Sequence, residues 1–292
     1  MSATLALRGL LGDSISCTTL DDNPEKASRG GWCFAPSDPD PLLGAADLKA
    51  VYDACTEGGS YTGRCTAPLL VDLETCTIIS NESADIVRIL NQFDPTDASG
   101  RVDAADVGRV IDLYPASLAA SIDETNAWVY EQVNNGVYRA GFATRQAAYE
   151  QAERDVHSGL ARCDALLAGS RFLCGARVTE ADVRLLPTAL RFDGVYASFF
   201  RCGRKQIRSD YPNVARWAKE MLSLTGPGLF SLADARRSYY TNLFPLNPGG
   251  IVPAGPTEDD LGFAEAAAAA AAASARDESA FEWRERASSM VA

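Results

Sequence analysis

The sequence has 292 residues, of which 47% are hydrophobic and 23% charged, a composition typical of a globular protein of one or two domains. Its net charge of −12 argues against a nucleic-acid backbone or an anionic membrane surface as a partner. It contains no run of about 20 apolar residues, and its N-terminus lacks the basic and apolar segments of a signal peptide. We therefore expect no transmembrane span and a cytoplasmic protein.

Eight cysteines and one histidine limit the chemistry of the chain. The cysteines include no Cys-x-x-Cys pair, so no metal site is expected. In a chain without a secretion signal, they are expected to be free and mostly buried thiols rather than disulfides. His157 flanks the apolar stripe of a predicted helix, and this spacing indicates packing, so we expect a structural role for it.

The first 95 residues alternate between strand and helix patterns. They predict a strand over 14–20, a helix over 46–55, a hairpin formed by 66–72 and 76–80, and a helix over 82–90. The order strand, helix, hairpin, helix corresponds to the second half of a thioredoxin-like domain, with at most the end of its first helix. We therefore expect a partial thioredoxin-like domain in residues 1–95.

A polar, turn-forming segment over 94–101 predicts the boundary to a second domain, 96–256. Apolar residues recur there at intervals of three and four, which predicts helices over 115–133, 144–168, 179–192 and 212–224. Thr179 and Asp182 have the spacing of a capping box, with Val178 and Val183 placed as a hydrophobic staple. We interpret this box as a device for folding and not as a site.

Regular structure is expected to end after Gly228, where several prolines follow. The last segment, 257–292, is of low complexity and contains an alanine run over 266–273. Alanine favours helix but has little apolar area to bury, so we expect a solvated or frayed helical tail.

Two backbone features of the first domain are candidates for holding a peptide-like thiol such as glutathione. Pro68 opens a predicted strand, and a cis Ala67–Pro68 bond would present the backbone N–H and C=O of Ala67 to such a ligand. Glu82 and Ser83 begin a predicted helix, where unpaired amides attract a carboxylate. A simple edge proline, and ordinary N-capping by Asn81 or Ser83, are alternatives that the sequence leaves open.

Four aromatic residues lie outside the apolar stripes: Trp32, Tyr138, Tyr239 and Tyr240. Trp32 is in a glycine-rich turn, Tyr138 follows Asn-Asn-Gly-Val, and the adjacent tyrosines lie in the segment expected to be irregular. Phenols placed near turns can donate hydrogen bonds to an aromatic diol or stabilise its anion. Packing in a core or at its rim is the alternative for each of them.

Several strings resemble the glutathionyl-hydroquinone reductases, the omega-like xi class of glutathione transferases. They are NNGVYRAGFATRQAAYE at 134–150, RVTEADVRLLPTALRFDGVY at 177–196, DYPNV at 210–214, GGIVPAGP at 249–256, TGRCTAPLLVD at 62–72 and SNES at 80–83. The resemblance covers residues 5–256. It implies a two-domain glutathione transferase fold, with a truncated α+β thioredoxin-like N-terminal domain, an all-α C-terminal domain and a homodimer formed largely through the helices.

The resemblance also implies a thiol chemistry with glutathione as cosubstrate and no metal. A cysteine thiolate attacks the sulfur of a glutathionyl-hydroquinone, which releases the hydroquinone and leaves a protein–glutathione mixed disulfide. A second glutathione resolves it to oxidised glutathione. By matching positions, the glutathione-binding residues would be Trp32, Ala67, Pro68, Glu82 and Ser83. The hydroquinone would contact Tyr138 and one or both of Tyr239 and Tyr240.

One departure from the family bears on activity. The family nucleophile lies in a Cys-Pro-Trp-Ala segment at the start of the first helix, whereas no cysteine in this sequence precedes a proline. Because residues 5–10 resemble the later part of that helix, we expect the segment upstream of Met1 and negligible turnover by these 292 residues. Cys33, next to Trp32, is a hypothesis for a substitute thiol. The alternative function is a non-catalytic glutathione transferase-like protein that binds a ligand or dimerises.

Overall fold

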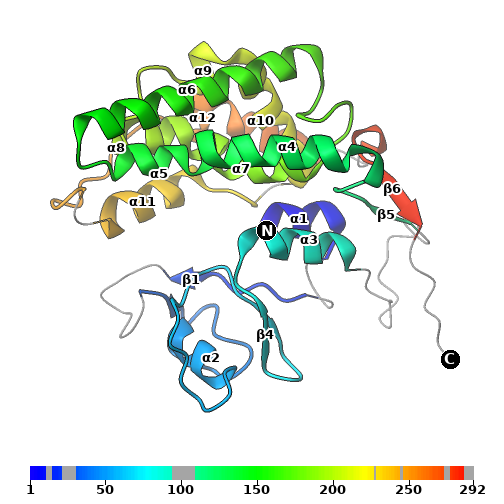
Figure 1. Ribbon diagram of the computed structural model, residues 1–292, viewed down its shortest axis with the longest axis vertical. Helices are drawn as coiled ribbons and strands as arrows, with labels where there is room; N and C mark the ends of the chain where they lie inside the picture. Colours follow the sequence, from blue (N-terminus) through cyan, green and yellow to red (C-terminus); the bar gives the residue numbers. More distant parts are fainter. Residues whose placement is uncertain are drawn as a thin grey trace. The chain divides into compact units, whose positions relative to one another are not determined.

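The computed structural model describes residues 1–10, 15–21, 31–93, 109–226, 228–243, 246–272 and 277–285. The chain forms two compact units (Figure 1). The N-terminal unit comprises Leu10–Pro95 with Met1, and the helical unit comprises Ser2–Gly9 together with Thr96–Ala292. The polar segment over 94–101 lies outside the described residues.

The N-terminal unit is built from short elements. They are β1 (Leu20–Asp21), β2 (Cys33–Phe34), α2 (Leu48–Ala54), β3 (Leu70–Asp72), β4 (Thr77–Ser80) and α3 (Ser83–Gln92). β1 pairs antiparallel with β2, and β3 pairs antiparallel with β4, so the predicted hairpin and both predicted helices are confirmed. The strand predicted over 14–20 is wrong, since only Leu20 of its described residues lies in one of these strands. β-Branched residues extend a strand only where a partner strand continues beside them, and β2 offers two residues.

Helices α2 and α3 bury the apolar faces that their spacing predicts. The buried apolar residues are Leu48, Val51 and Tyr52 in α2, and Ile86, Val87 and Leu90 in α3. Asp47 caps α2, where its carboxylate accepts the backbone N–H of Ala50 at 2.8 Å. By contrast, α3 begins without a side-chain cap.

The helical unit contains most of the regular structure. Its elements are α1 (Ser2–Arg8), β5 (Arg109–Ile111), η2 (Ala116–Leu118), α4 (Ala119–Val129), η3 (Tyr130–Asn134), α5 (Gly136–Gly141), α6 (Gln146–Gly169), α7 (Glu180–Arg191), η4 (Phe192–Tyr196), α8 (Ala197–Phe199), α9 (Ile207–Asp210), α10 (Pro212–Thr225), α11 (Leu232–Asn242), α12 (Glu258–Leu261), α13 (Phe263–Ala272), η5 (Glu278–Ala280) and β6 (Trp283–Glu285). The four helices predicted from apolar spacing are confirmed. Two of them continue through π-helical segments, η3 and η4, into α5 and α8.

A buried apolar cluster holds the helical unit together. Its largest fully buried side chains include Trp217, Tyr196, Phe172 and Phe281. Among the residues that the structure describes, the N-terminal unit contributes none to this cluster. The two units therefore differ in how they are stabilised.

The predicted capping box at the start of α7 is present and is buried in this core. The carboxylate of Asp182 accepts the backbone N–H groups of Thr179 at 2.9 Å and of Leu173 at 3.0 Å. It also accepts the indole N–H of Trp217 at 2.9 Å. One side chain thus joins the start of α7, the preceding loop and α10, and both valines of the predicted staple are buried.

The irregular structure expected after Gly228 is wrong over Leu232–Asn242, which forms α11. Ser231 caps the first turn of this helix. The buried residues are Leu232, Arg236 and Tyr240. Because this stripe is narrow and contains an arginine, apolar spacing does not reveal the helix.

The described part of the C-terminal segment, 257–272 and 277–285, packs into the helical unit, which corrects the solvated tail expected for these residues. A second capping box begins α12, and α13 contacts α10. Phe281 is 1% exposed, and β6 pairs with β5, where Trp283 lies opposite Ile111. α1 belongs to this unit as well, with Leu7 fully buried in its core.

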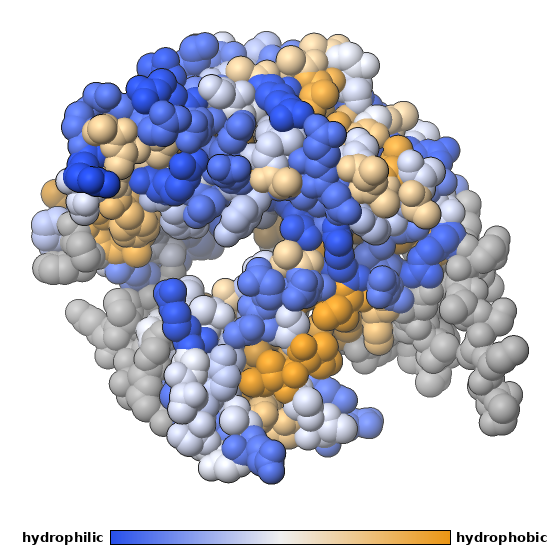
Figure 2. Space-filling model, in the orientation of Figure 1, coloured by the Kyte–Doolittle hydropathy of each residue, from blue (hydrophilic) through white to orange (hydrophobic). Residues whose placement is uncertain are grey.

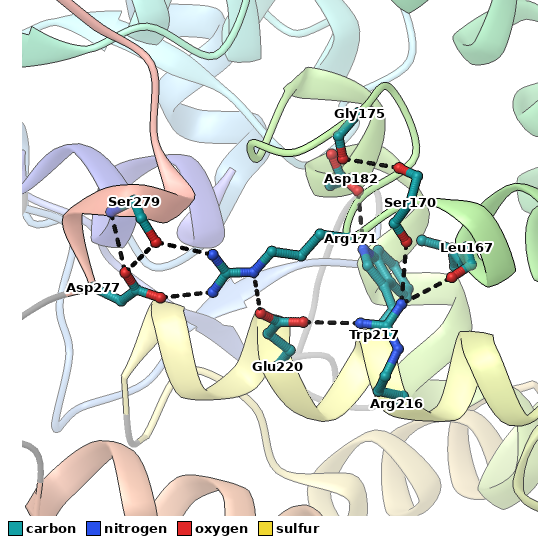
Figure 3. Close-up of polar contacts among 10 residues, drawn as sticks. All are labelled: Leu167, Ser170, Arg171, Gly175, Asp182, Arg216, Trp217, Glu220, Asp277 and Ser279. Atoms are coloured by element: carbon teal, nitrogen blue, oxygen red, sulfur yellow. Dashed lines mark hydrogen bonds and ion pairs between the residues drawn. The ribbon is translucent and has the colours of Figure 1, made fainter.

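Arg171 anchors the C-terminal segment, as Figure 3 shows. Its guanidinium donates to the carboxylate of Glu220 on α10 at 2.5 Å. It also donates to Asp277 at 2.6 Å and to the hydroxyl of Ser279 at 3.2 Å. The residues that follow the alanine run therefore help to fix the segment, in addition to the packing of α13 against α10.

The β3–β4 hairpin carries exposed apolar side chains. Leu73 and Ile79 are 48% and 50% exposed, and Figure 2 shows apolar surface over this hairpin. Within the described ranges, β3 and β4 form a sheet of two strands. A search of the described helices finds none that combines the length and the apolar character needed to cross a membrane.

Candidate functional site

Three phenols of the helical unit meet in what we call the phenol cluster: Tyr138 of α5, Tyr196 of η4 and Tyr239 of α11. The hydroxyl of Tyr239 is hydrogen-bonded to that of Tyr138 and lies 2.9 Å from that of Tyr196. The hydroxyls of Tyr138 and Tyr196 are 3.5 Å apart. Because Tyr196 is buried and Tyr138 is 36% exposed, the cluster extends from the core to the surface.

The rings of the phenol cluster pack around Phe200. Their centroids lie 5.2 Å (Tyr138), 5.5 Å (Tyr196) and 5.9 Å (Tyr239) from its ring centroid. Gly141 permits this approach, because a Cβ at that position would lie 2.2 Å from the Phe200 ring. The close packing against Phe200 therefore requires a glycine at position 141.

A second glycine allows α11 to approach η4. A Cβ added at Gly194 would lie 2.6 Å from a methyl of Leu232, the first residue of α11. Without this close contact, Tyr239 would sit farther from Tyr196. Gly194 is thus part of the geometry that assembles the phenol cluster.

The π-helical segments direct two of the phenols. Tyr196 ends η4, and Tyr138 lies one turn after η3. A π-helical turn contains an extra residue, which rotates the following side chains by about 100° around the helix axis. Asn134 fixes η3 against α7, since its amide donates to the carbonyl of Arg184 at 3.0 Å and accepts the Thr188 hydroxyl at 2.9 Å.

The surroundings of Tyr196 and Tyr239 keep their two phenols protonated. Burial, followed by the neighbouring phenols, raises the pKa of Tyr196 and of Tyr239 well above the ordinary value. Arg191 at the end of α7 stays charged near neutral pH, because the pKa of a guanidinium lies far above 7 and its surroundings here raise it despite burial. Near neutral pH the cluster therefore offers O–H donors beside a cation.

Tyr240 lies apart from the phenol cluster. Its ring packs on Phe199 at a centroid distance of 4.6 Å, and burial raises the pKa of its phenol. Successive residues of a helix point about 100° apart, so α11 cannot direct both Tyr239 and Tyr240 to one place. Tyr196 was missed by sequence reasoning because it lies among buried apolar residues, although it ends the string at 177–196.

Trp32 and Cys33 lie at the start of β2 in the N-terminal unit. The carbonyl of Trp32 accepts the N–H of Leu48 at 3.1 Å, which ties β2 to α2. Cys33 is 4% exposed, and its sulfur lies 3.5 Å from the carbonyl oxygen of Asp21. A thiol so enclosed is poorly reached by a substrate, which favours packing over the role of a substitute nucleophile.

The Ala67–Pro68 peptide bond is cis, which is the first of the two alternatives that the sequence left open. Tyr52 of α2 holds the preceding residue, since its hydroxyl donates to the carbonyl of Thr66 at 2.8 Å. Among the described residues, no hydrogen bond engages the backbone N–H or C=O of Ala67. Both groups remain free to pair with a peptide-like ligand.

Glu82 and Ser83 form the N-terminus of α3, and both are exposed. The backbone N–H of Glu82 donates to the Ser80 hydroxyl at 3.1 Å. α3 has no side-chain cap hydrogen bond, so the N-capping by Asn81 or Ser83 that the sequence left open is not what the structure contains. An uncapped helix start is suited to a carboxylate.

His157 lies in the core of the helical unit. Its Nδ1 is 2.9 Å from the Tyr211 hydroxyl, and its Nε2 is 3.1 Å from the Cys202 carbonyl and 3.1 Å from a carboxylate oxygen of Glu153. Burial lowers the pKa of His157, although Glu153 opposes this. The expected structural role agrees with these contacts.

All eight cysteines are free, as predicted. Only Cys33, Cys163 and Cys202 are buried, so the expectation of mostly buried thiols is wrong. No group of three or more His, Cys, Asp and Glu side chains suited to a metal ion occurs in the parts of the chain that the structure describes.

Comparison with known proteins connects these features to one family. The model of the glutathione S-transferase C-terminal domain matches residues 146–220. The glutathionyl-hydroquinone reductase PcpF of Sphingobium chlorophenolicum is 43% identical over 237 residues, which are 79% of this chain and 71% of that protein. The glutathionyl-hydroquinone reductase YqjG of Escherichia coli K12 is 42% identical over 263 residues, 88% of this chain and 76% of that protein.

Solved structures agree. The glutathione-bound structure of YqjG from Escherichia coli K-12 superposes with a TM-score of 0.75 at 36% identity, over 87% of this chain and 80% of that chain. The xi glutathione transferase of Phanerochaete chrysosporium has a TM-score of 0.75 at 38% identity, over 88% of this chain and 86% of that chain. The chain therefore has the two-domain glutathione transferase fold that the resemblance implied.

Proposed function

The chain belongs to the glutathionyl-hydroquinone reductases, the xi class of glutathione transferases, and we propose that it binds glutathione and a glutathionyl-hydroquinone for the reaction of this family. The observation that carries the proposal is the phenol cluster. Three elements bring Tyr138, Tyr196 and Tyr239 within hydrogen-bonding distance of one another in a helical unit of this family. Such a group of O–H donors suits an aromatic diol.

The proposed reaction exchanges thiols and needs no metal. A cysteine thiolate attacks the sulfur of the conjugate, the bond between that sulfur and the ring carbon breaks, and the carbon takes a proton as the hydroquinone leaves. The mixed disulfide is attacked by a second glutathione, which releases glutathione disulfide and restores the thiolate. In total, the thioether sulfur of the conjugate and the thiol of the second glutathione are oxidised to one disulfide, while the ring carbon is reduced.

The residues of this chain are proposed to bind and orient. Tyr138 and Tyr239 donate to the diol oxygens, and Tyr196 fixes Tyr239 from the buried side. The charge of Arg191 favours negative charge on a diol oxygen as the ring accepts electrons. Tyr240 was predicted to share this role, but its place against Phe199 supports a packing role.

The N-terminal unit is proposed to hold the glutathionyl part. The unpaired backbone N–H and C=O of Ala67, beside Pro68, pair with the cysteinyl backbone of glutathione. The open start of α3 takes the α-carboxylate through Ser83, and Glu82 accepts from the ammonium group. Trp32 contributes a contact surface. The glutathione-bound structure of the relative YqjG supports glutathione as the ligand.

The second candidate is a protein that binds these ligands without turning them over. The observation that favours it is the absence of a Cys-Pro pair among the 292 residues. We expect the 292-residue chain to reduce a glutathionyl-hydroquinone at a negligible rate. Robust turnover that Cys33→Ser abolishes would contradict this and assign the nucleophile to Cys33.

The binding proposal is tested by calorimetric titration of the chain with glutathione and with a glutathionyl-hydroquinone. Tyr239→Phe removes the hydroxyl that contacts both other phenols, and we expect it to weaken the affinity for the conjugate about tenfold and to leave that for glutathione unchanged. Tyr240→Phe is the matched control and should change neither. Equal effects of the two variants, or no binding by the unchanged chain, would refute the assignment.

A homodimer formed through the helical unit and a cytoplasmic location are part of the proposal. Exposed aromatic and apolar side chains on its helices, Tyr130, Phe142 and Leu166, support a contact between subunits. The eight free thiols support a reducing compartment. Sedimentation equilibrium should give twice the chain mass, and a monomer at micromolar concentration would exclude the dimer.

A further inference from the structure

Two cysteines of the N-terminal unit have their sulfur atoms 3.2 Å apart. Cys55 is the C-cap of α2, and Cys76 is the last residue of the turn between β3 and β4. Both are free, and both are half-buried, so a small reagent can reach them. They are separate from Cys33, which is enclosed beside Asp21.

The backbone at Cys76 sets the direction of its side chain. Its φ is 51°, in the left-handed region where glycine and asparagine are favoured over cysteine. The turn requires this conformation: the carboxylate of Asp72 accepts the N–H groups of Glu74 at 2.9 Å and of Thr75 at 3.3 Å, and β4 then returns opposite β3. A cysteine at this unfavourable position, with its sulfur against that of another cysteine, needs a reason beyond the turn.

We propose that Cys55 and Cys76 form a reversible intramolecular disulfide when the protein meets a low-molecular-weight disulfide such as glutathione disulfide. The inference goes beyond the proposed function and does not depend on it. The oxidant is of the class that the proposed reaction releases.

The step is a thiol–disulfide exchange in two stages. The thiolate of Cys76 attacks one sulfur of glutathione disulfide, that S–S bond breaks, and one glutathione leaves and takes a proton. The thiolate of Cys55 then attacks the Cys76 sulfur and releases the second glutathione. In total, two protein thiols are oxidised and one glutathione disulfide is reduced to two glutathiones.

The order of attack follows from the surroundings of Cys55. Burial, and then the neighbouring Cys76, raise the pKa of Cys55 to about 12, so it is the poorer first nucleophile. The closing stage should therefore be faster at higher pH.

The new bond would join the end of α2 to the hairpin, and residues 56–66 lie within the loop that it closes. Several hydrogen bonds already tie α2 to this segment, among them those from Lys49 to the carbonyl of Tyr61 at 3.0 Å and from Tyr52 to that of Thr66 at 2.8 Å. A covalent link would restrict opening of the segment that leads directly to Ala67. Oxidation would thus stiffen the backbone beside the proposed glutathione contacts.

Peptide mapping of the full chain tests the inference. Trypsin cleavage after Lys49, Arg64 and Arg88 yields one peptide, 50–64, with Cys55 alone and another, 65–88, with Cys65 and Cys76. After incubation with glutathione disulfide and alkylation, we expect these two peptides to be linked and to separate on reduction. The link should be lost in Cys55→Ser and Cys76→Asn, and should persist in the controls Cys17→Ser and Cys65→Ser.

Asparagine is chosen at position 76 because it tolerates the left-handed backbone. Amide exchange over 56–66 should slow several-fold in oxidised protein and recover on reduction, and the oxidised Cys76→Asn variant should show no slowing. The proposal is overturned by glutathione adducts that persist without a link, by a link that survives Cys76→Asn, or by unmodified thiols at excess glutathione disulfide.

Discussion

The N-terminal unit and the helical unit are stabilised in different ways. The helical unit has one continuous buried cluster that includes Trp217 and Phe172. The N-terminal unit consists of strand pairs of two to four residues and two helices, α2 and α3, held by contacts such as that from Tyr52 to Thr66. Short pairings leave backbone groups unpaired, whereas a continuous core fixes side chains.

This difference matches the two kinds of contact that a glutathione conjugate needs. The N-terminal unit offers backbone groups at Ala67 and an open helix start at Ser83, which suit a peptide. The helical unit offers the phenol cluster, whose hydroxyls are held in place by packing around Phe200. In the proposed function, peptide recognition belongs to the less tightly packed unit and ring recognition to the tightly packed one.

The largest expected contrast is in local stability. The described residues of the N-terminal unit share no part of the buried cluster. We therefore expect the free energy of the opening that exposes its slowest amides, around Tyr52 and Leu90, to be about 3 kcal/mol lower than for the amides around Leu160 and Trp217. That corresponds to a rate difference of roughly 100-fold. Native-state hydrogen exchange measures it, and equal protection in both units would show that they unfold together.

The next effect compares two capping boxes. Asp182→Ala leaves three buried N–H donors without an acceptor, including that of Trp217 shown in Figure 3, and should lower the free energy of unfolding by about 4 kcal/mol. Asp260 in the exposed box of α12 is the control, and Asp260→Ala should cost about 1 kcal/mol. Urea unfolding measures both, and similar values would mean that burial adds nothing.

A smaller effect concerns Gly194. Gly194→Ala places a methyl 2.6 Å from Leu232 and should displace α11, at a cost of about 2 kcal/mol. Gly169→Ala is the control, since nothing lies within 4 Å of an added Cβ there, and it should change stability by less than about 0.5 kcal/mol. Thermal unfolding distinguishes them, and an unchanged Gly194→Ala protein would exclude the close contact.

The smallest effect is a pH dependence through His157. Burial lowers its pKa in the folded state, so its neutral form is favoured there, and its contribution to stability is complete above the unfolded pKa of about 6.5. That contribution is lost as the pH falls from there toward the folded pKa. Urea unfolding of the chain and of His157→Gln should differ in slope below pH 6.5, and parallel curves would assign the slope to other groups.

Much of this fold follows from sequence patterns, and the failures have physical causes. The helices with broad apolar faces, α6, α7 and α10, were predictable from spacing. α11 was not, because its buried stripe is narrow and contains Arg236. The tail was misjudged because contacts of Arg171 and Phe281, which the alanine run does not reveal, anchor it.

The site was predictable in part. A cis bond before Pro68 was one of two alternatives that the sequence left open, and the structure contains it. Tyr196 was missed because a buried tyrosine in an apolar stripe is indistinguishable from a core residue, and only the π-helical turn of η4 brings its hydroxyl to Tyr239. The sequence could not assign different roles to Tyr239 and Tyr240, because only the helical geometry of α11 shows that they point in different directions.

Amide exchange of the 292-residue chain with and without saturating glutathione is the most direct test of ligand binding by the N-terminal unit. We expect the amide of Ala67 and those at the start of α3, from Ser83, to exchange more slowly with glutathione, while α13 and β6 are unchanged. Unaltered exchange at Ala67 and at the start of α3, at a glutathione concentration that saturates enzymes of this family, would contradict the proposed site.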